Sequence, residues 1–298
     1  MKQALIDLGS NSVRLTVYDI KETSFTVLFK EKIMAGLAGY VDEGRLNDEG
    51  IQCAIDSLAN FQNIVSLLEI KNLSVFATAS LRNITNTEEA LTAIEEATRL
   101  HVDVITGEKE AQLGYTGVTH DIQDSNGIVV DIGGASTELV HFKDNEIMQA
   151  CSIQIGSLKL YKECVRNILP GKGSMKRIRS MIRNYFSDIE ISETQCMICT
   201  GGTARATLHL CSKLFHLPDT QHTFTFHQLN ELLQTFQDNT EISSEFLLKF
   251  EPSRIHTIIP GMMILHYLMK QYSIKECTVS QYGVREGYLL EEIIKKSS

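Results

Sequence analysis

The stretch "LIDLGSNSVRLTV" (residues 5–17) decides the fold, because it returns later in the chain as "VVDIGGASTELVH" (residues 129–141). The repeat spacing is 131 − 7 = 124, and it superposes Asp7 on Asp131, Gly9 on Gly133, Ser12 on Ser136 and Leu15 on Leu139. Each copy reads as a strand, a small polar turn and a second strand. The repeat therefore predicts a duplicated structural unit rather than two unrelated domains.

Size and charge narrow the class of protein. A chain of 298 residues suits two domains of ordinary size. Its net charge of −9 argues against a broad surface for nucleic acid or anionic membrane, but it permits a local basic site. The N-terminus enters a strand pattern directly, and no window is apolar enough to span a membrane. We expect a cytoplasmic protein with seven mostly buried, reduced cysteines.

The order of elements repeats between the two halves. The first half reads β-β-β-α-β-α-β-α, with strands at 4–9, 12–20, 25–33, 72–80 and 101–106 and helices at 46–70, at 86–100 and from about Glu108. The second half begins with strands at 127–134, 136–142 and 146–157 and continues with helices that include a basic run. Another strand at 195–202 and further helices follow. We expect an α/β fold with domains at 1–120 and 121–286, and a C-terminal helix at 287–298 that returns to the first domain.

The paired turns have the composition of anion-binding loops. A strand that ends in Asp and runs into a Gly-rich, hydroxyl-bearing turn gathers backbone N–H groups around a small concavity. A third turn, "CTGGTARA" (residues 199–206), follows an apolar strand and opens a helix, whose N-terminus also suits an anion. Each turn alone is also compatible with an ordinary tight connection. Two copies in matching context favour phosphate held from two sides.

Six ordered motifs carry a resemblance that spans nearly the whole chain. The motifs are "DLGSNS", "ATASLR", "ITGEKEA", "DIGGASTE", "TGGTARA" and "VSQYGVREGYLL". In this order and spacing they resemble the exopolyphosphatase/guanosine pentaphosphate phosphohydrolase (Ppx/GppA) family. The resemblance implies duplicated ribonuclease-H-like domains of the actin, sugar kinase and heat-shock ATPase superfamily around a central cleft. It also implies magnesium-dependent hydrolysis of a terminal phosphoanhydride bond in inorganic polyphosphate or guanosine pentaphosphate, and we expect a homodimer.

The resemblance assigns roles to individual residues. It selects Glu110 as the catalytic base, although Glu108 would satisfy the helix dipole equally well. It matches Arg82 to an arginine that grips phosphate. Arg14 is inferred from the repeat instead, since 14 + 124 = 138 gives it the position in the first copy that Glu138 has in the second. The full phosphate-binding set is expected to be Gly9, Ser10, Asn11, Ser12, Arg14, Arg82, Gly133, Gly134, Ser136, Gly201, Gly202 and Thr203.

Carboxylates on the two turns are candidate magnesium ligands. Magnesium prefers hard oxygen ligands and usually takes one or two carboxylates beside waters and phosphates. Asp131 and Glu138 would share one Mg²⁺ across a hairpin, and Asp7 would orient the waters of the ion. The competing interpretation is that the two aspartates merely cap their turns.

Two departures and one charge run leave open questions. Ala135 replaces the third Gly of the family's "DIGGGSTE" and fits only if its φ is negative, and Lys109 stands where many relatives are acidic or polar. The run 172–183 holds Lys172, Lys176, Arg177, Arg179 and Arg183 with no acid, so it is either a polyanion track or a solvated helix face. A superfamily kinase and a non-catalytic alarmone sensor remain the alternatives to a hydrolase.

Overall fold

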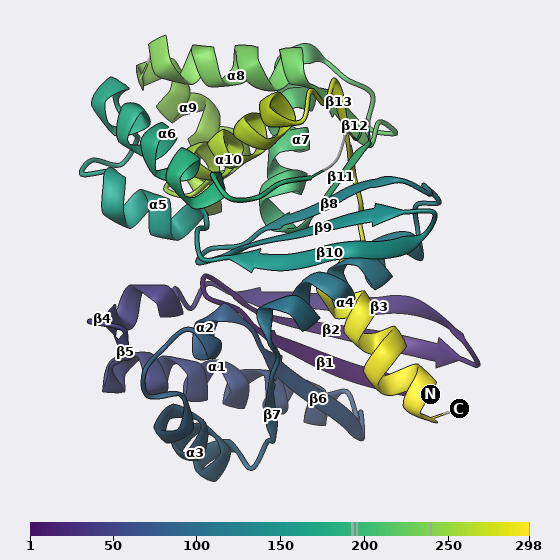
Figure 1. Cartoon of the computed structure of the whole chain (residues 1–298). Helices are drawn as coiled ribbons and strands as arrows, with labels where there is room; N and C mark the ends of the chain where they lie inside the picture. Colours follow the sequence, from purple (N-terminus) through teal and green to yellow (C-terminus); the bar gives the residue numbers. More distant parts are fainter. Residues whose placement is uncertain (192–193, 195, 239, 298) are drawn as a thin grey trace. The chain divides into compact units, whose positions relative to one another are not determined.

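The computed structural model describes residues 1–191, 194, 196–238 and 240–297 (Figure 1). The chain forms two compact units, of which unit 1 is Met1–Glu110 with Tyr288–Ser298 and unit 2 is Ala111–Gly287. The division falls inside helix α4 (Gly107–Thr119), upstream of the polar segment where the sequence places a boundary. The reason is that Tyr115 and Val118 of α4 pack against the sheet of unit 2. Gln195 and Ser298, at the ends of two expected elements, lie outside the described residues.

Unit 1 is a five-stranded mixed sheet with helices (Figure 1). Its strands lie in the order β3-β2-β1-β6-β7, with β1, β2 and β3 antiparallel and β1, β6 and β7 parallel. The strands are β1 (Lys2–Leu8), β2 (Val13–Lys21), β3 (Ser24–Ile33), β6 (Asn72–Ala77) and β7 (Val102–Val104). The remaining elements are η1 (Leu37–Tyr40), the small hairpin β4 (Val41–Asp42) and β5 (Arg45–Leu46), and the helices α1 (Asp48–Leu67), α2 (Ala79–Arg82) and α3 (Thr87–Thr98).

Local sequence explains the longest helix of unit 1. The side chain of Asn47 caps α1 by accepting a 2.9 Å hydrogen bond from the N–H of Gly50. Two acids follow in the first turn, where they favour the positive end of the helix dipole. Leu58 and Phe61 are fully buried on the face of α1 that packs into the core of unit 1. Cap, charge and apolar spacing therefore all specify this helix.

Unit 2 has a six-stranded sheet in the order β10-β9-β8-β11-β13-β12 (Figure 1). The strands are β8 (Gly127–Ile132), β9 (Thr137–Lys143), β10 (Glu146–Ile153), β11 (Met197–Thr200), β12 (Thr223–Thr225) and β13 (Glu276–Val279). The helices are α5 (Ser157–Cys164), α6 (Lys172–Phe186), α7 (Gly201–Phe215), α8 (Phe226–Asp238), α9 (Thr240–Phe250), the short η2 (Pro252–Arg254) and α10 (Ile258–Gln271).

The duplication predicted from the sequence is confirmed at the level of strand register. Five strands of each unit share one order and one set of directions, and β12 is an additional antiparallel edge in unit 2. Asp7 pairs with Arg14 in the β1–β2 ladder, and Asp131 pairs with Glu138 in the β8–β9 ladder. The 124-residue offset therefore maps one ladder onto the other. Both units have the ribonuclease-H-like arrangement.

The chain ends in α11 (Val284–Tyr288), a π-helical stretch η3 (Leu289–Ile294) and α12 (Lys295–Ser297). The Tyr288 ring stacks on Phe76 with centroids 4.7 Å apart, and its hydroxyl donates a 3.0 Å hydrogen bond to Asp103. These contacts hold the C-terminal residues within unit 1. None of the described helices has the length and apolar character needed to cross a lipid bilayer.

Candidate functional site

The turn after β1 is held by its own backbone. A Cβ on Gly9 would lie 2.9 Å from the carbonyl oxygen of Ser12, so only glycine fits without displacing the turn. The carbonyl oxygens of Ser10 and Asn11 accept hydrogen bonds of 2.9 and 3.0 Å from N–H groups of residues 36–38. Both serines are buried. The predicted first cradle is thus a constrained turn in which Gly9 has a defined steric role.

The turn after β8 repeats this geometry. The N–H of Gly133 donates a 3.0 Å hydrogen bond to the carbonyl oxygen of Ser136, and a Cβ on Gly133 would come within 3.2 Å of the same oxygen. The Gly134 carbonyl accepts two hydrogen bonds, of 2.9 and 3.0 Å, from the first turn of α5. Gly156 packs so closely on the turn that a Cβ there would lie 2.5 Å from Gly134. Ala135 has no positive φ, so the missing third glycine leaves the turn intact.

Asp131 and Glu138 form the carboxylate pair of unit 2. They are direct cross-strand neighbours, which places their Cβ atoms about 4.5–5.5 Å apart on one face of the sheet. Glu138 is only 5% exposed, and its Oε1 accepts a 2.7 Å hydrogen bond from the hydroxyl of Ser152. Across the described chain, no group of three or more His, Cys, Asp or Glu side chains is placed to hold a metal. Two adjacent carboxylates match the smaller protein ligand set that magnesium takes.

In unit 1 the corresponding cross-strand pair is Asp7 and Arg14, which joins a carboxylate to a cation instead of to a second carboxylate. Arg14 occupies the ladder position that Glu138 holds in unit 2, and it faces Asp7 across the β1–β2 ladder. Its Nε donates a 3.1 Å hydrogen bond to the hydroxyl of Ser12, which ties the guanidinium to the first turn. A guanidinium beside a carboxylate cancels the attraction of that carboxylate for a cation. This geometry suits the predicted phosphate contact of Arg14 better than a metal-ligand role for Asp7.

The third Gly-rich turn meets Asp131. Gly201 has φ +80°, and a Cβ there would lie 2.0 Å from Asp131 Oδ1, so both its backbone conformation and its surroundings require glycine. Thr200, at the end of β11, pairs with Asp131 in the parallel ladder. The Thr203 hydroxyl is buried and donates 2.9 Å to the Ile132 carbonyl, which anchors α7 to β8. The structure thus brings the second and third turns together, with Thr203 in a packing role.

Three arginines around Asp131 were not among the functional residues predicted from the sequence. Burial lowers the pKa of Arg205 to about 10, and the positive charge of Arg285 lowers this pKa further. The negative charges of Asp131 and Glu286 act in the opposite direction. Burial also lowers the pKa of Arg254, against the influence of Asp131. Arg285 itself is only 8% exposed. A signal was available for two of them, because Arg205 and Arg285 lie inside the quoted "TGGTARA" and "VSQYGVREGYLL" motifs.

The segment before α11 is hydrogen-bonded to the N-terminus of α7. The hydroxyl of Thr200 donates a 2.6 Å hydrogen bond to the carbonyl of Tyr282, and a Cβ on Gly283 would lie 2.6 Å from the same hydroxyl oxygen. The N–H of Gly283 in turn donates 3.0 Å to the buried carboxylate of Glu286. The last motif therefore belongs to the same site as the second and third turns.

Glu110 and Arg82 form an ion pair within unit 1. Arg82 Nη1 lies 2.7 Å from Glu110 Oε2 and donates 3.2 Å to the carbonyl of Ile105. The two side chains are 15% and 12% exposed, whereas Glu108 is exposed. The Ser80 hydroxyl donates to the Leu8 carbonyl, which fixes the α2 turn beside the end of β1. The structure thus unites the predicted base with the predicted phosphate-binding arginine.

The remaining basic residues have varied environments. Lys109 Nζ lies 2.6 Å from Glu292 Oε1, so its charge anchors the C-terminal helix in unit 1. In the run 172–183, Arg177 is structural, because its Nη2 donates 2.7 Å to the carbonyl of Cys164. Arg179 and Arg183 instead line a cavity of unit 2.

Two ribonuclease-H-like units, each with a Gly-Ser turn after its first strand, place the chain in the class of actin-like two-domain proteins. A family model described as "Ppx/GppA phosphatase family" matches residues 16–296. The chain therefore belongs to the Ppx/GppA phosphatase family, as the six motifs predict.

Individual relatives agree with this assignment. The chain is 29% identical to a putative exopolyphosphatase of Haemophilus influenzae, covering 97% of this chain and 91% of the relative. It is 27% identical to a guanosine-5'-triphosphate,3'-diphosphate pyrophosphatase of Aeromonas salmonicida, covering 96% of this chain but 58% of that protein. The crystal structure of the Aquifex aeolicus Ppx/GppA family member superposes with a TM-score of 0.81 at 26% identity, covering 100% of this chain and 99% of that one.

Proposed function

We propose that this chain is a hydrolase that releases terminal orthophosphate from inorganic polyphosphate, guanosine pentaphosphate or both. Membership of the phosphatase family supports the reaction class. The relatives named exopolyphosphatase and guanosine-5'-triphosphate,3'-diphosphate pyrophosphatase support the two substrates. The observation that carries the proposal is the 2.7 Å contact between Arg82 and Glu110, which joins a phosphate-binding group to a candidate base.

In the proposed mechanism Glu110 accepts a proton from the attacking water. A general base must lie within hydrogen-bond reach of that water and is typically worth about 10²–10⁴-fold in rate. Arg82 orients the Glu110 carboxylate through their ion pair and binds phosphate oxygens through its planar guanidinium. The turn residues Gly9, Ser12 and Ser136 are proposed to shape the phosphate-binding surface.

We further propose that Asp131 and Glu138 hold Mg²⁺. Their register places two hard oxygen ligands side by side, and the Ser152 hydroxyl fixes the orientation of Glu138. The ion, when bound, would supply positive charge against the phosphoryl oxygens. Arg205 and Arg254, which are half-buried neighbours of Asp131, are proposed to add further positive charge near that carboxylate.

The test is orthophosphate release from polyphosphate and guanosine pentaphosphate, assayed side by side with and without ADP. Glu110→Gln should retain substrate binding and lose about 10²–10⁴-fold in turnover. Glu108→Gln is the matched control, because it removes the same charge from the same helix start. Turnover of Glu110→Gln within a few-fold of the parent would refute the assigned base. Phosphate transfer that requires ADP would indicate a kinase, and binding without release by the parent would indicate a sensor.

Two coarser properties complete the proposal. All seven cysteines are free thiols, which suits the reducing environment of the cytoplasm. The homodimer remains a prediction that light scattering of the purified chain would test.

A further inference from the structure

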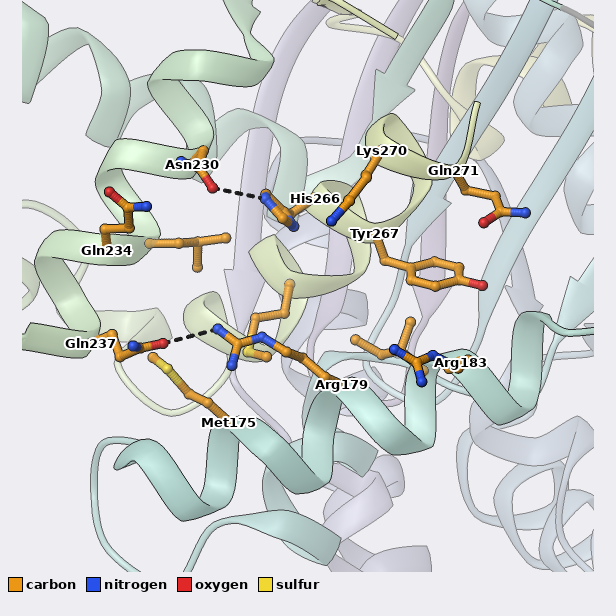
Figure 2. Close-up of a pocket in the computed structure, with 13 residues that line it drawn as sticks. Met175, Arg179, Arg183, Asn230, Gln234, Gln237, His266, Tyr267, Lys270 and Gln271 are labelled. Atoms are coloured by element: carbon orange, nitrogen blue, oxygen red, sulfur yellow. Dashed lines mark hydrogen bonds between the residues drawn. The ribbon is translucent and has the colours of Figure 1, made fainter. Parts of the chain in front are cut away.

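Unit 2 contains a cavity of about 690 Å³ that plays no part in the site described above (Figure 2). Its walls come from α6, α8 and α10, and its lining shares no residue with the candidate site. The volume lies within the range of about 300–1,000 Å³ that small-molecule pockets occupy. The cavity is therefore large enough for a nucleotide-sized ligand.

The lining of this cavity is cationic and contains no acid. Arg179 and Arg183 project from α6, and Lys270 projects from α10 on the opposite wall (Figure 2). None of the three forms an ion pair with a carboxylate of any described side chain. Amide groups of α8 supply further polar contacts, including a 2.9 Å hydrogen bond from Arg179 Nη2 to Gln237 Oε1. Three like charges gathered on one pocket of a chain with net charge −9 favour the binding of an anion there.

The sequence of α6 explains why its arginines face the cavity. The buried stripe of this helix consists of Met175, Ile178, Ile182 and Phe186. Arg179 and Arg183 follow at a spacing of four residues, which places them together beside that stripe. Lys172 and Lys176 belong to the same basic run but are exposed and do not line the cavity. Arg179 and Arg183 are exposed as well, so the two parts of the run differ in that only one of them lines the cavity.

His266 lies on the cavity wall, and the positive charges of the lining affect its pKa. The pKa of His266 is lowered by burial first and then by the charges of Lys270 and Arg179. Its Nε2 lies 3.1 Å from Asn230 Oδ1, so the ring is already held by hydrogen bonding (Figure 2). The neutral imidazole and the amides can donate to a ligand without adding charge. The walls thus combine fixed cations with neutral hydrogen-bonding groups.

We propose that this cavity is a second, non-catalytic site for a small molecule that carries an oligophosphate group. Two arginines and a lysine suit several phosphoryl oxygens at once. The apolar floor, which includes Ile182 and Leu233, and the ring of Tyr267 give room for a nucleoside attached to those phosphates. The shared chemistry is the oligophosphate, borne by a nucleotide or by a short inorganic chain. The proposal does not depend on the assignment of Glu110.

Calorimetric titration of the full chain in EDTA tests the site, with inorganic tripolyphosphate and GTP as the two probes. R179Q/R183Q and K270Q should each weaken one binding step by about tenfold or more, since charge-assisted hydrogen bonds are lost. K172Q/K176Q is the matched control, with the same charge change on the same helix, and should stay within about twofold of the parent. Circular dichroism melting curves verify that each variant is folded.

The outcomes separate the proposal from its competitors. Unchanged binding by R179Q/R183Q overturns it, and an equal loss in K172Q/K176Q overturns it in favour of diffuse charge attraction. Tighter binding of GTP than of tripolyphosphate identifies a nucleotide as the ligand, whereas equal or weaker binding identifies the inorganic chain. A loss confined to the pocket variants supports the site even if the chain proves to have no hydrolase activity.

Discussion

The guanidinium of Arg82 bridges the side chain of Glu110, at 2.7 Å, and the backbone carbonyl of Ile105, at 3.2 Å. The contact joins α2 to the start of α4, so two segments that are separate in sequence become one rigid group. A phosphate bound by Arg82 would therefore lie close to the carboxylate of Glu110. We therefore expect Arg82 to couple substrate binding to proton transfer.

Arg82→Gln is expected to raise KM and to lower kcat together, because the guanidinium both binds phosphate and orients Glu110. A charge-assisted contact of this kind corresponds to about tenfold or more in kcat/KM. Steady-state kinetics of phosphate release measures both constants. Arg45→Gln, which removes an exposed arginine paired with Glu89 at 2.6 Å, is the control and should leave them unchanged. An effect on KM alone would contradict the orienting role.

Glu138→Gln is expected to shift the magnesium dependence of activity to concentrations at least about tenfold higher, because one of the two proposed oxygen ligands loses its charge. Glu146→Gln removes an exposed acid from β10 and should leave the titration unchanged. Activity measured against magnesium concentration distinguishes them. Superimposable curves for Glu138→Gln and the parent would exclude Glu138 from the metal site.

Gly201→Ala is expected to destabilise the protein and to impair magnesium dependence. The new Cβ would lie 2.0 Å from Asp131 Oδ1, and φ +80° costs a non-glycine residue about 1–2 kcal/mol before any clash. Gly114→Ala is the control, since its Cβ would meet nothing within 4 Å, and it should add about 0.5–1 kcal/mol of stability. Urea unfolding and the magnesium titration provide the two readouts. Wild-type values for Gly201→Ala in both would show that Asp131 can move freely.

The Lys109–Glu292 ion pair is expected to stabilise the docked C-terminal helix in a pH-dependent manner. Hydrogen bonds from Lys109 and Lys296 lower the pKa of Glu292 below its ordinary value of 4.5. A carboxyl with a lowered folded pKa contributes stability above the unfolded pKa and loses it as the pH falls through the folded value. A double-mutant cycle of Lys109→Ala and Glu292→Ala should give a coupling of about 0.2–1 kcal/mol at pH 7 and a smaller one at pH 3. Equal coupling at both pH values would rule out the ionic interaction.

The sequence predicted the duplicated unit well because strand register follows side-chain alternation. Once Asp7 was aligned with Asp131, the facing positions of Arg14 and Glu138 followed from the hairpin alone. Strand β13 was not predicted, because its alternation of polar and apolar residues covers only four positions, which is too short a run to indicate a strand by itself. Thr203 was expected to bind phosphate, and the structure gives its hydroxyl a packing role that composition cannot reveal.

The arginines around Asp131 illustrate a different limit. Arg205 and Arg254 lie 254 − 205 = 49 residues apart, and Arg285 follows after a further 285 − 254 = 31 residues. Only the packing of α7, η2 and α11 within unit 2 brings them into one electrostatic environment. The motifs mark Arg205 and Arg285 one at a time, but no local pattern in the chain marks Arg254 or the gathering of the three charges.

The shared ladder position of Arg14 and Glu138 makes the two hairpins a matched pair of opposite polarity. The same backbone presents a guanidinium beside Asp7 in one unit and a second carboxylate beside Asp131 in the other. Arg14 neutralises the charge of Asp7 in the first arrangement, whereas the second places two carboxylates together, so we expect a divalent cation to prefer the second. The difference between Arg14 and Glu138 at one repeated position thus gives two copies of the same fold different local charges.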